Sequence, residues 1–251
     1  MTANQDIGIV GLGAMGLGMA QSLRRAGYRV HACDVRPEAA RAFAAEGGVA
    51  CSTPADAAAA SEVLISAVVN SAQTEAVLFG EGGAATSLKP GSVFVMCSTV
   101  DPNWSIDLER RLAERDVLYL DAPMSGGAAK AAAGQMTMMT AGRPEAYAKA
   151  GAALDAMAGK VYRLGDRAGA GSKVKIINQL LAGVHIAATA EAMALGLREG
   201  VDPAALYEVI THSAGNSWMF ENRMAHVLAA DYTPLSAVDI FVKDLGLVLD
   251  T

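Results

Sequence analysis

The sequence has little of several features that mark other classes of protein. Aromatic residues make up 5% and charged residues 18% of the 251 residues, whereas hydrophobic residues make up 52%. So much apolar content can form a large core, which excludes a disordered protein. The 20 basic and 26 acidic residues give a net charge of −6, with no block of basic residues. We therefore expect no nucleic-acid partner and no binding to an anionic membrane surface.

Cysteine and histidine are also scarce. The three cysteines, Cys33, Cys51 and Cys97, show no C-x-x-C spacing, which predicts reduced, packed thiols in a reducing compartment. The four histidines do not cluster with cysteines or acidic residues at the spacing of metal ligands. The sequence therefore predicts no metal site.

No segment is typical of secretion or of a membrane span. The first residues lack the basic region of a signal peptide. The longest apolar stretch, 176–197, contains Gln179, His185 and Glu191, which a membrane span rarely carries. We expect a cytoplasmic protein that does not enter the membrane.

Short β-rich runs alternate with helical segments as far as residue 163. The predicted strands are 7–10, 29–33, 63–68, 93–97, 117–121, 136–141 and 160–163. The predicted helices between them are 14–26, 37–46, 54–60, 102–115 and 144–157. Several of these helices begin with proline, which is favoured in a first turn. This alternation predicts a mainly parallel sheet with helices on both faces.

The strand pattern stops after Gly171. We expect Ser172 to cap a long helix that ends near 199 and is followed by Gly200. Further helices are predicted at 203–213, 219–230 and 236–250. The long helix has an apolar stripe at helical spacing, formed by Ile176, Leu180, Val184 and Ala187.

These two patterns predict two domains joined by the long helix. Residues 1–165 would form a doubly wound α/β domain, and residues 166–251 an all-helical domain. The segment 236–250 is amphipathic to its end and lacks a C-terminal cap. We therefore expect a partner subunit or downstream residues to complete the helical core, and we predict a homodimer or homotetramer.

A glycine-rich turn follows the first predicted strand and opens the first predicted helix. Gly11 permits a tight turn, Gly13 lets a pyrophosphate approach the backbone, and Gly16 lets the helix pack closely on the sheet. Asp34 ends the second predicted strand, where an acidic side chain binds the ribose hydroxyls of a dinucleotide. The spacing alone is a weak signal, but its place between strand and helix predicts a Rossmann-type dinucleotide-binding domain. The predicted cofactor contacts here are Gly11, Leu12, Gly13, Ala14, Met15, Gly16 and Asp34.

Asp34 also bears on the choice between NAD and NADP. A carboxylate at this position repels a 2′-phosphate, which favours NAD. Arg36 follows two residues later and could weaken that preference, although a solvated position at the start of the next helix is its simpler interpretation. We predict NAD as the cofactor, with NADP the less favoured alternative.

Two polar segments are candidates for the chemistry. Ser125, Gly126 and Gly127 follow a strand, where a hydroxyl and bare N–H groups could bind a carboxylate. An ordinary glycine-rich turn explains the same spacing.

The second candidate is a polar group on the long helix. Lys175 shares one helix face with Asn178 and Gln179. A lysine near a helix N-terminus is destabilised as a cation, which would suit it to proton transfer. The alternative is a solvated lysine that lies along the helix surface.

Four ordered segments resemble the signatures of the β-hydroxyacid dehydrogenases, the family that includes 3-hydroxyisobutyrate dehydrogenase and tartronate semialdehyde reductase. These segments are 11–20, 121–127, 169–179 and 243–245. Four motifs in order are far more specific than one glycine turn, and together they extend over the whole chain.

The resemblance implies a role for each matching residue. Lys175 would be the general acid/base, with Asn178 orienting the substrate beside it. The substrate carboxylate would be held by Ser125, Gly126 and Gly127. Further cofactor contacts would come from Val68, Val69, Thr99 and Lys243.

The resemblance also implies an activity. We expect NAD-dependent oxidation of a small sugar acid or hydroxy acid, with L-threonate oxidised to its 2-oxo acid. The alternatives in the same family are oxidation of 3-hydroxyisobutyrate and reduction of tartronate or succinic semialdehyde. A different alternative is a catalytically silent module that only binds a dinucleotide, against which the joint presence of Lys175 and Asn178 weighs.

Overall fold

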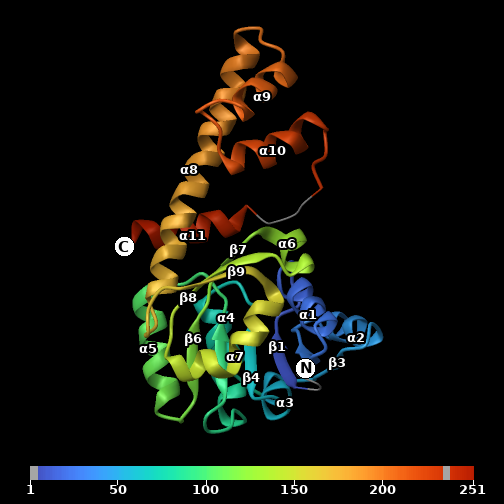
Figure 1. Cartoon of the computed structure of the whole chain (residues 1–251), viewed down its shortest axis with the longest axis vertical. Coiled ribbons are helices and arrows are strands. Elements are labelled where there is room, and N and C mark those ends of the chain that lie inside the picture. Colours follow the sequence, from blue (N-terminus) through green and yellow to red (C-terminus); the bar gives the residue numbers. More distant parts are fainter. Residues whose placement is uncertain (1–4, 234–237) are drawn as a thin grey trace. The chain divides into compact units, whose positions relative to one another are not determined.

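The computed structural model describes residues 5–233 and 238–251. They divide into two compact units, Met1–Lys175 and Ile176–Thr251 (Figure 1). The sequence analysis placed the boundary after residue 165. In the structure the first turn of the long helix still belongs to the first unit, where Ser172 hydrogen-bonds with Asp121.

The first unit contains a six-stranded sheet in the order β3-β2-β1-β4-β5-β6, in which every pair of neighbours is parallel. The order reverses beside β1, so the predicted doubly wound sheet is confirmed. β3 was not predicted because two residues carry too little pattern. The strands are β1 (Asp6–Val10), β2 (Arg29–Cys33), β3 (Val49–Ala50), β4 (Val63–Ser66), β5 (Val93–Met96) and β6 (Leu118–Asp121).

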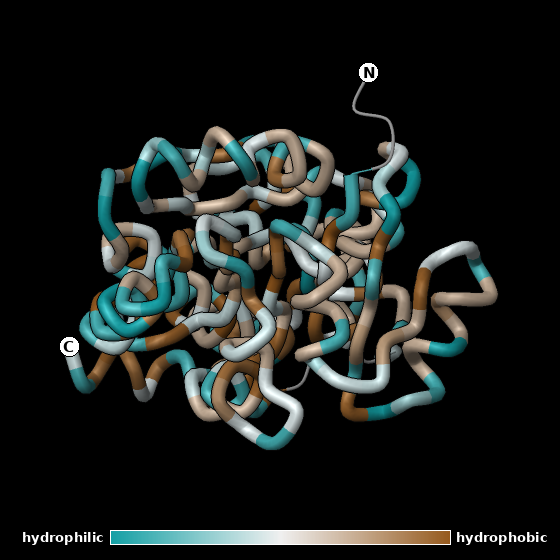
Figure 2. The backbone as a smooth tube through the Cα atoms, turned by 90° about the horizontal axis from the view of Figure 1, so that it is seen from below, coloured by the Kyte–Doolittle hydropathy of each residue, from teal (hydrophilic) through white to brown (hydrophobic). Residues whose placement is uncertain are grey.

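Helices cover both faces of this sheet. Successive strand residues point to opposite faces, so Ile65 packs in one hydrophobic cluster and Leu64 in the other. The backbone tube in Figure 2 shows hydrophobic stretches toward the interior and hydrophilic stretches at the outside. The helices are α1 (Gly16–Arg25), α2 (Pro37–Ala45), α3 (Pro54–Ala59), α4 (Ser71–Phe79), η1 (Ala84–Thr86), α5 (Pro102–Ala113), α6 (Gly127–Ala133) and α7 (Pro144–Met157).

A second, smaller sheet corrects one expectation. The predicted strands at 136–141 and 160–163 do not extend the main sheet. They correspond to β8 (Met136–Thr140) and β9 (Ala158–Arg163), which form a separate three-stranded sheet with β7 (Met124–Ser125). β7 is antiparallel to β8, and a bridge between Asp121 and Ala141 ties β8 to the end of β6. Residues 121–125 run along β8 without reversing, and the chain turns back only through α6, so strand–helix alternation alone could not reveal this arrangement.

In the second unit, the described residues form helices joined by turns and irregular segments, and no strand is present among them. It has a small core in which Met193 packs with Phe220 and Met224, and Tyr207 stacks on Phe220 at 5.9 Å. Part of the predicted helix 236–250 lies outside the described residues. The helices are α8 (Ala170–Arg198), which begins in the first unit, α9 (Pro203–Thr211), α10 (Trp218–Leu228) and α11 (Asp239–Leu249).

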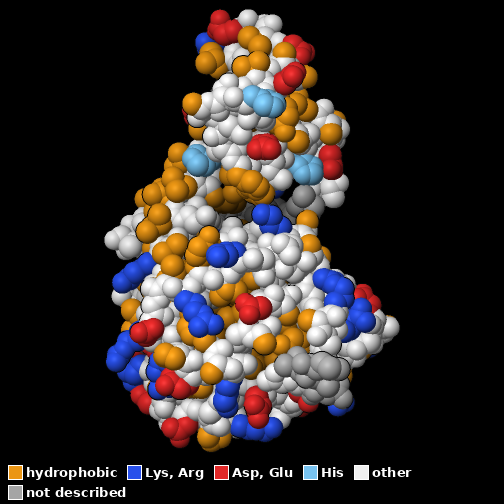
Figure 3. Space-filling model, viewed as in Figure 1, with side chains coloured by type: hydrophobic (Ala, Val, Ile, Leu, Met, Phe, Trp, Pro, Cys, Tyr) orange, Lys and Arg blue, Asp and Glu red, His pale blue; other side chains and the backbone are white. Residues whose placement is uncertain are grey.

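The long helix α8 differs from its prediction in two ways. It begins before Ser172, whose hydroxyl donates to Asp121 instead of capping the helix. The expected apolar stripe is not the buried face, because Leu180 and Val184 are 41% and 52% exposed. Figure 3 shows exposed hydrophobic side chains along the helical unit. Ile176 is the one member of the predicted stripe that is buried, and the buried positions on α8 are Gly171, Ser172, Lys175, Ile176, Gln179, Ala182, Thr189, Met193 and Gly196.

α8 is long and apolar enough to cross a membrane by length and composition alone. Both ends of this helix nevertheless belong to folded units. Ser172 hydrogen-bonds with Asp121 near its start, and Met193 packs in the helical core near its end.

Candidate active site

The carboxyl ends of the parallel strands meet at one edge of the main sheet, which is where ligands bind in open α/β folds. Asp121 is the last residue of β6 at this edge. Several predicted cofactor residues follow the other strands directly or within three residues. They are Gly11 after β1, Asp34 after β2, Val68 and Val69 after β4, and Thr99 after β5.

The glycine turn is tight at two positions and open at a third. Gly11 has a φ of +96°, and a Cβ there would lie 2.7 Å from the Ala67 carbonyl oxygen. A Cβ on Gly16 would clash with the Gly11 carbonyl oxygen. A Cβ on Gly13, in contrast, would have no heavy atom within 4 Å. The backbone at Gly13 is therefore open to a ligand, which fits the approach of a pyrophosphate.

The Asp34 carboxylate is held at this turn by three hydrogen bonds. Its Oδ2 accepts from the Leu12 N–H at 2.6 Å, and its Oδ1 accepts from the Arg36 N–H at 2.9 Å and from Arg36 Nε at 3.3 Å. Burial alone would raise the pKa of this carboxyl, but the hydrogen bonds from Arg36 and Leu12 hold the pKa below its usual 3.8. Asp34 is thus a fixed anion beside the glycine turn, as binding of ribose hydroxyls requires.

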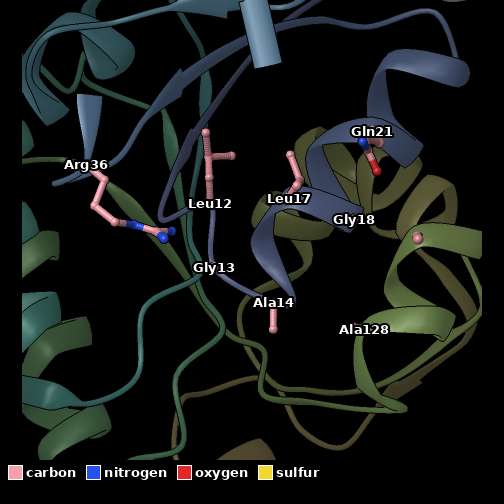
Figure 4. A pocket seen from close by; sticks show the side chains of 9 residues that line it. Leu12, Gly13, Ala14, Leu17, Gly18, Gln21, Arg36 and Ala128 are labelled. Atoms are coloured by element: carbon pink, nitrogen blue, oxygen red, sulfur yellow. The ribbon is translucent and has the colours of Figure 1, made fainter. Parts of the chain in front are cut away.

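A groove of about 440 Å³ lies beside the turn, a volume typical of small-molecule sites. Figure 4 shows Arg36 at one side of the groove, Gln21 on α1 at the other, and the turn of Leu12, Gly13 and Ala14 between them. The lining residues are Leu12, Gly13, Ala14, Leu17, Gly18, Gln21, Arg36, Ala128 and Ala132.

The turn after β4 is fixed by residues that the sequence analysis did not identify. The Val69 N–H donates to Gln73 Oε1 at 2.9 Å, and Asn70 caps α4 by accepting from the Gln73 N–H. Ser98, after β5, donates its hydroxyl to the Val68 carbonyl at 2.8 Å. An asparagine three residues before a glutamine is a capping signal that could have predicted this turn and α4.

The predicted substrate turn joins the end of β7 to the start of α6. Ser125 is half-buried and pairs with Thr137 of β8. Gly126 and Gly127 have backbone φ values of +138° and +76°, which residues other than glycine rarely adopt. The Met139 N–H donates to the Pro123 carbonyl at 2.9 Å, so β8 also fixes the segment that leads to Ser125.

Lys175 lies on α8, one turn after the helix begins, and is 7% exposed. At the start of this helix the Asp121 carboxylate accepts hydrogen bonds from the Gly169 and Ser172 N–H groups, each at 2.9 Å, and from the Ser172 hydroxyl at 2.7 Å. The sequence analysis noted Asp121 only as the first residue of a motif. Asp121 lies 48 and 51 residues from these donors, so no local pattern could pair them.

Within the second unit, two predicted site residues belong to one polar network. Asn178 donates to Gln179 Oε1 at 3.0 Å, and Gln179 Nε2 donates to Asp244 Oδ2 at 2.6 Å. The other carboxylate oxygen lies 2.7 Å from Lys243 Nζ. Asn178 and Lys243, predicted for substrate and cofactor, are thus joined through Gln179 and Asp244. The role of Asp244 was missed, although a buried acid in an apolar helix calls for a partner.

Across the described residues, no group of three or more histidine, cysteine or acidic side chains gathers to hold a metal ion. The parallel sheet, the glycine turn and the fixed Asp34 define the class of protein. It is a dinucleotide-binding protein with a Rossmann-type domain.

Comparison with known proteins specifies the family. Residues 6–165 match the NAD binding domain of 6-phosphogluconate dehydrogenase, and residues 169–251 match the NAD-binding domain of NADP-dependent 3-hydroxyisobutyrate dehydrogenase. The chain is 66% identical to the L-threonate dehydrogenase of Cupriavidus necator over 99% of this chain and 84% of that protein. It is 34% identical to the 3-hydroxyisobutyrate dehydrogenase of Pseudomonas aeruginosa over 97% of this chain and 84% of that protein.

A solved structure agrees with these matches. A 3-hydroxyisobutyrate dehydrogenase from Salmonella typhimurium superposes with a TM-score of 0.91 and 51% identity, covering 98% of this chain and 86% of that one. The chain belongs to the 3-hydroxyisobutyrate dehydrogenase-like family of NAD(P)-binding hydroxyacid dehydrogenases. The predicted family and enzyme class are confirmed.

Proposed function

We propose that this protein oxidises L-threonate to its 2-oxo acid with NAD as the cofactor. The choice of L-threonate as the substrate rests on a difference in sequence identity between this chain and two relatives. The relative named L-threonate dehydrogenase shares 66% of its residues with this chain, whereas the one named 3-hydroxyisobutyrate dehydrogenase from Pseudomonas aeruginosa shares 34%.

In this proposal Lys175 takes and returns the hydroxyl proton. When bound, the nicotinamide supplies the acceptor for the hydride that leaves the hydroxyl-bearing carbon. Lys175 Nζ, as a neutral amine, accepts the hydroxyl proton during oxidation and donates it in the reverse direction. The burial of its side chain in the first turns of α8 supports this role, because it keeps the amine away from bulk water.

The other predicted residues bind and orient. Ser125 and the N–H groups of Gly126 and Gly127 hold the substrate carboxylate, and Asn178 orients the substrate beside Lys175. Fixing two ends of a small acid in this way holds the reacting carbon in one position, which lowers the entropic part of the barrier. A Cβ on Gly127 would meet no heavy atom within 4 Å, so the backbone there lies beside open space, which supports this role.

The preference for NAD is supported by Asp34. Its carboxylate is held by Leu12 and Arg36, and its lowered pKa keeps it charged at neutral pH. A 2′-phosphate would therefore meet a fixed negative charge. Arg36 could attract such a phosphate, but its Nε lies 3.3 Å from Asp34 Oδ1 and is paired with that carboxylate.

The test measures NADH formation with a panel of hydroxy acids that includes L-threonate and 3-hydroxyisobutyrate. We expect NADH to form from L-threonate with NAD, and at least tenfold less product with NADP. The Lys175→Ala variant should bind NADH normally and lose nearly all turnover. A Lys175→Ala variant with full turnover would overturn the catalytic role, whereas no activity on L-threonate would overturn the substrate.

A second substrate is favoured by one observation. The solved structure that is 51% identical to this chain is described as a 3-hydroxyisobutyrate dehydrogenase. The same lysine chemistry would serve 3-hydroxyisobutyrate, so the two proposals differ only in the substrate. Comparing kcat/KM for L-threonate and for 3-hydroxyisobutyrate with NAD decides between them.

We also propose that the protein is a cytoplasmic homodimer or homotetramer. The helical unit buries only a small core, while apolar side chains such as Leu195 and Val209 are exposed. Apolar surface of this kind is typical of subunit contacts. Light scattering at several protein concentrations measures the mass, and a monomer at all of them would contradict the proposal.

A further inference from the structure

The start of α8 is capped by a residue from another strand. Asp121 is fully buried at the end of β6, and its two carboxylate oxygens accept three hydrogen bonds from Gly169 and Ser172. A carboxylate at a helix N-terminus satisfies N–H groups that have no partner within the helix, and it interacts favourably with the helix dipole.

The backbone of Asp121 is itself fixed. Its N–H donates to the Ala141 carbonyl at 2.9 Å, and the Ala141 N–H donates back to the Asp121 carbonyl at 2.8 Å. These bonds attach the end of β6 to β8. The carboxylate that caps α8 therefore belongs to a rigid part of the sheet, and the cap fixes the position of the helix start.

Gly171 allows the helix to approach this closely. A Cβ on Gly171 would clash with the Met139 carbonyl oxygen and would lie 2.9 Å from the Asp121 carbonyl oxygen. Both obstacles are backbone atoms of strands, which cannot move aside as a flexible side chain can. Any side chain at this position would push the first turn of α8 away from the sheet.

Because of helix geometry, the position of the first turn of α8 also determines the position of Lys175. Residues three and four apart lie on one helix face, so Lys175 shares a face with Gly171 and Ser172. Lys175 is buried with them, whereas Lys173 and Val174, on the other side of the turn, are exposed. A displacement of the first turn therefore displaces Lys175 as well.

We propose that Asp121 is a positioning residue for catalysis, which fixes the first turn of α8 on the sheet and thereby sets the place of the Lys175 amine. This inference rests on the proposed role of Lys175. Four residues after Asp121 the same segment reaches Ser125, the predicted carboxylate contact. One side chain thus fixes the predicted acid/base to the strand that leads into the predicted substrate turn.

The consequence for activity is large because catalysis depends on small distances. A displacement of about 1 Å at a reacting group can lower the rate about 100-fold. Asp121→Asn keeps the shape of the side chain but replaces one accepting oxygen by a donor. We expect kcat to fall about 100-fold, while NADH affinity stays within about twofold because the glycine turn and Asp34 are unchanged.

A second, milder variant tests the same contact in case Asp121→Asn does not fold. Ser172→Ala removes only the hydroxyl bond to Asp121 Oδ1 and suits a helix well. We expect kcat to fall about fivefold to tenfold, in the same direction as Asp121→Asn. The matched control is Asp202→Asn, which changes the cap of α9 where Asp202 accepts from the Ala205 N–H. Its kcat should equal that of the unchanged protein.

A double-variant comparison separates positioning from simple loss of structure. If Asp121 acts through Lys175, the Asp121→Asn change should lower the rate far less in a Lys175→Ala background, measured with added methylamine as a substitute base. An equal loss in both backgrounds would overturn the proposal. So would a wild-type kcat in Ser172→Ala, or in a folded Asp121→Asn protein.

These experiments also distinguish a failure of the positioning role of Asp121 from a failure of the proposed function. Full turnover by Lys175→Ala would refute the role of that lysine, whatever Asp121 does. A Lys175→Ala variant without turnover, together with an Asp121→Asn variant of normal kcat, would refute only the positioning role. The assay uses whichever acid of the panel is turned over fastest, so the outcome does not depend on L-threonate.

Discussion

The Gln179 amide donates a 2.6 Å hydrogen bond to the Asp244 carboxylate and joins α8 to α11 within the helical unit. Asp244 is 1% exposed, and its second oxygen lies beside Lys243 Nζ. A carboxylate buried this deeply is stable only when its oxygens have partners. The two helices are therefore held together by a polar contact in a unit with a small apolar core.

Loss of this contact should destabilise the helical unit. Gln179→Leu removes one partner of the buried carboxylate, and we expect the free energy of unfolding to fall by about 1–3 kcal/mol. NADH affinity should fall too if Lys243 contacts the cofactor. Urea unfolding and NADH titration measure the two effects. The neighbouring Leu180→Gln change at an exposed position is the control, and equal stability of both variants would contradict the prediction.

Substitution by alanine at two glycines of the cofactor turn should have different effects, on NADH affinity at Gly13 and on stability at Gly16. Gly13→Ala adds a methyl group where the structure has open space, so the free energy of unfolding should change by less than about 1 kcal/mol. NADH affinity should fall at least about tenfold, since the methyl group occupies the predicted path of the pyrophosphate. Calorimetry gives both values, and unchanged NADH affinity would exclude Gly13 from the site.

Gly16→Ala should act on the fold itself. Its methyl group would clash with the Gly11 carbonyl, so α1 must shift. Overpacking of this kind costs about 1–3 kcal/mol of unfolding free energy. Thermal unfolding without cofactor measures the loss, and a Gly16→Ala protein as stable as Gly13→Ala would show that the turn tolerates the shift.

Asp34 should stabilise the folded protein in a pH-dependent way. Its hydrogen bonds lower the pKa of the folded carboxyl below the usual 3.8. The stabilising contribution is therefore complete above the unfolded-state value and is lost as the pH falls through the lowered folded-state value. The stability difference between the unchanged protein and Asp34→Asn should shrink below pH 3.8, as urea unfolding at several pH values would reveal. A difference that does not depend on pH would argue against this account.

The thiols of Cys33 and Cys97 should be unreactive in the folded protein. Burial raises their pKa from 9.0 to about 11 and about 12, with smaller contributions from Cys51 at Cys33 and from nearby aspartates at both. At neutral pH almost no thiolate is present to react. Labelling with a disulfide reagent should be slow until urea is added, and fast labelling of either thiol without urea would contradict its buried position.

The same raised pKa values carry a stability consequence. Thiols of the unfolded chain ionise near pH 9.0, before those of the folded protein. The contribution of the un-ionised thiols is therefore present below that pH and is lost as the pH rises toward 11. Urea unfolding of Cys97→Ala beside the unchanged protein should show a smaller fall in stability across this range. Parallel curves would contradict the prediction.

Much of the first unit could be predicted because its signals are local. The strand 7–10, the glycines that follow it and Asp34 lie within one short segment, and each residue has a geometric reason for its type. The strand β3 was missed because two residues show no periodicity, whereas α4 was missed because its capping signal at Asn70 was overlooked. The small sheet was assigned wrongly because the antiparallel pairing of β7 with β8 has no strand–helix signature.

The sequence by itself determined the class of fold, the dinucleotide turn and the family, since these depend on residues close together in the chain. The tertiary structure decided which groups serve the candidate site from a distance. Asp121 reaches Ser172 across 51 residues, and Gln179 reaches Asp244 across 65. The sequence instead predicted Ser172 as the cap and Leu180 as part of the buried face. A buried polar group is held by whichever partner the folded chain brings within about 3 Å, and that partner need not be near in sequence.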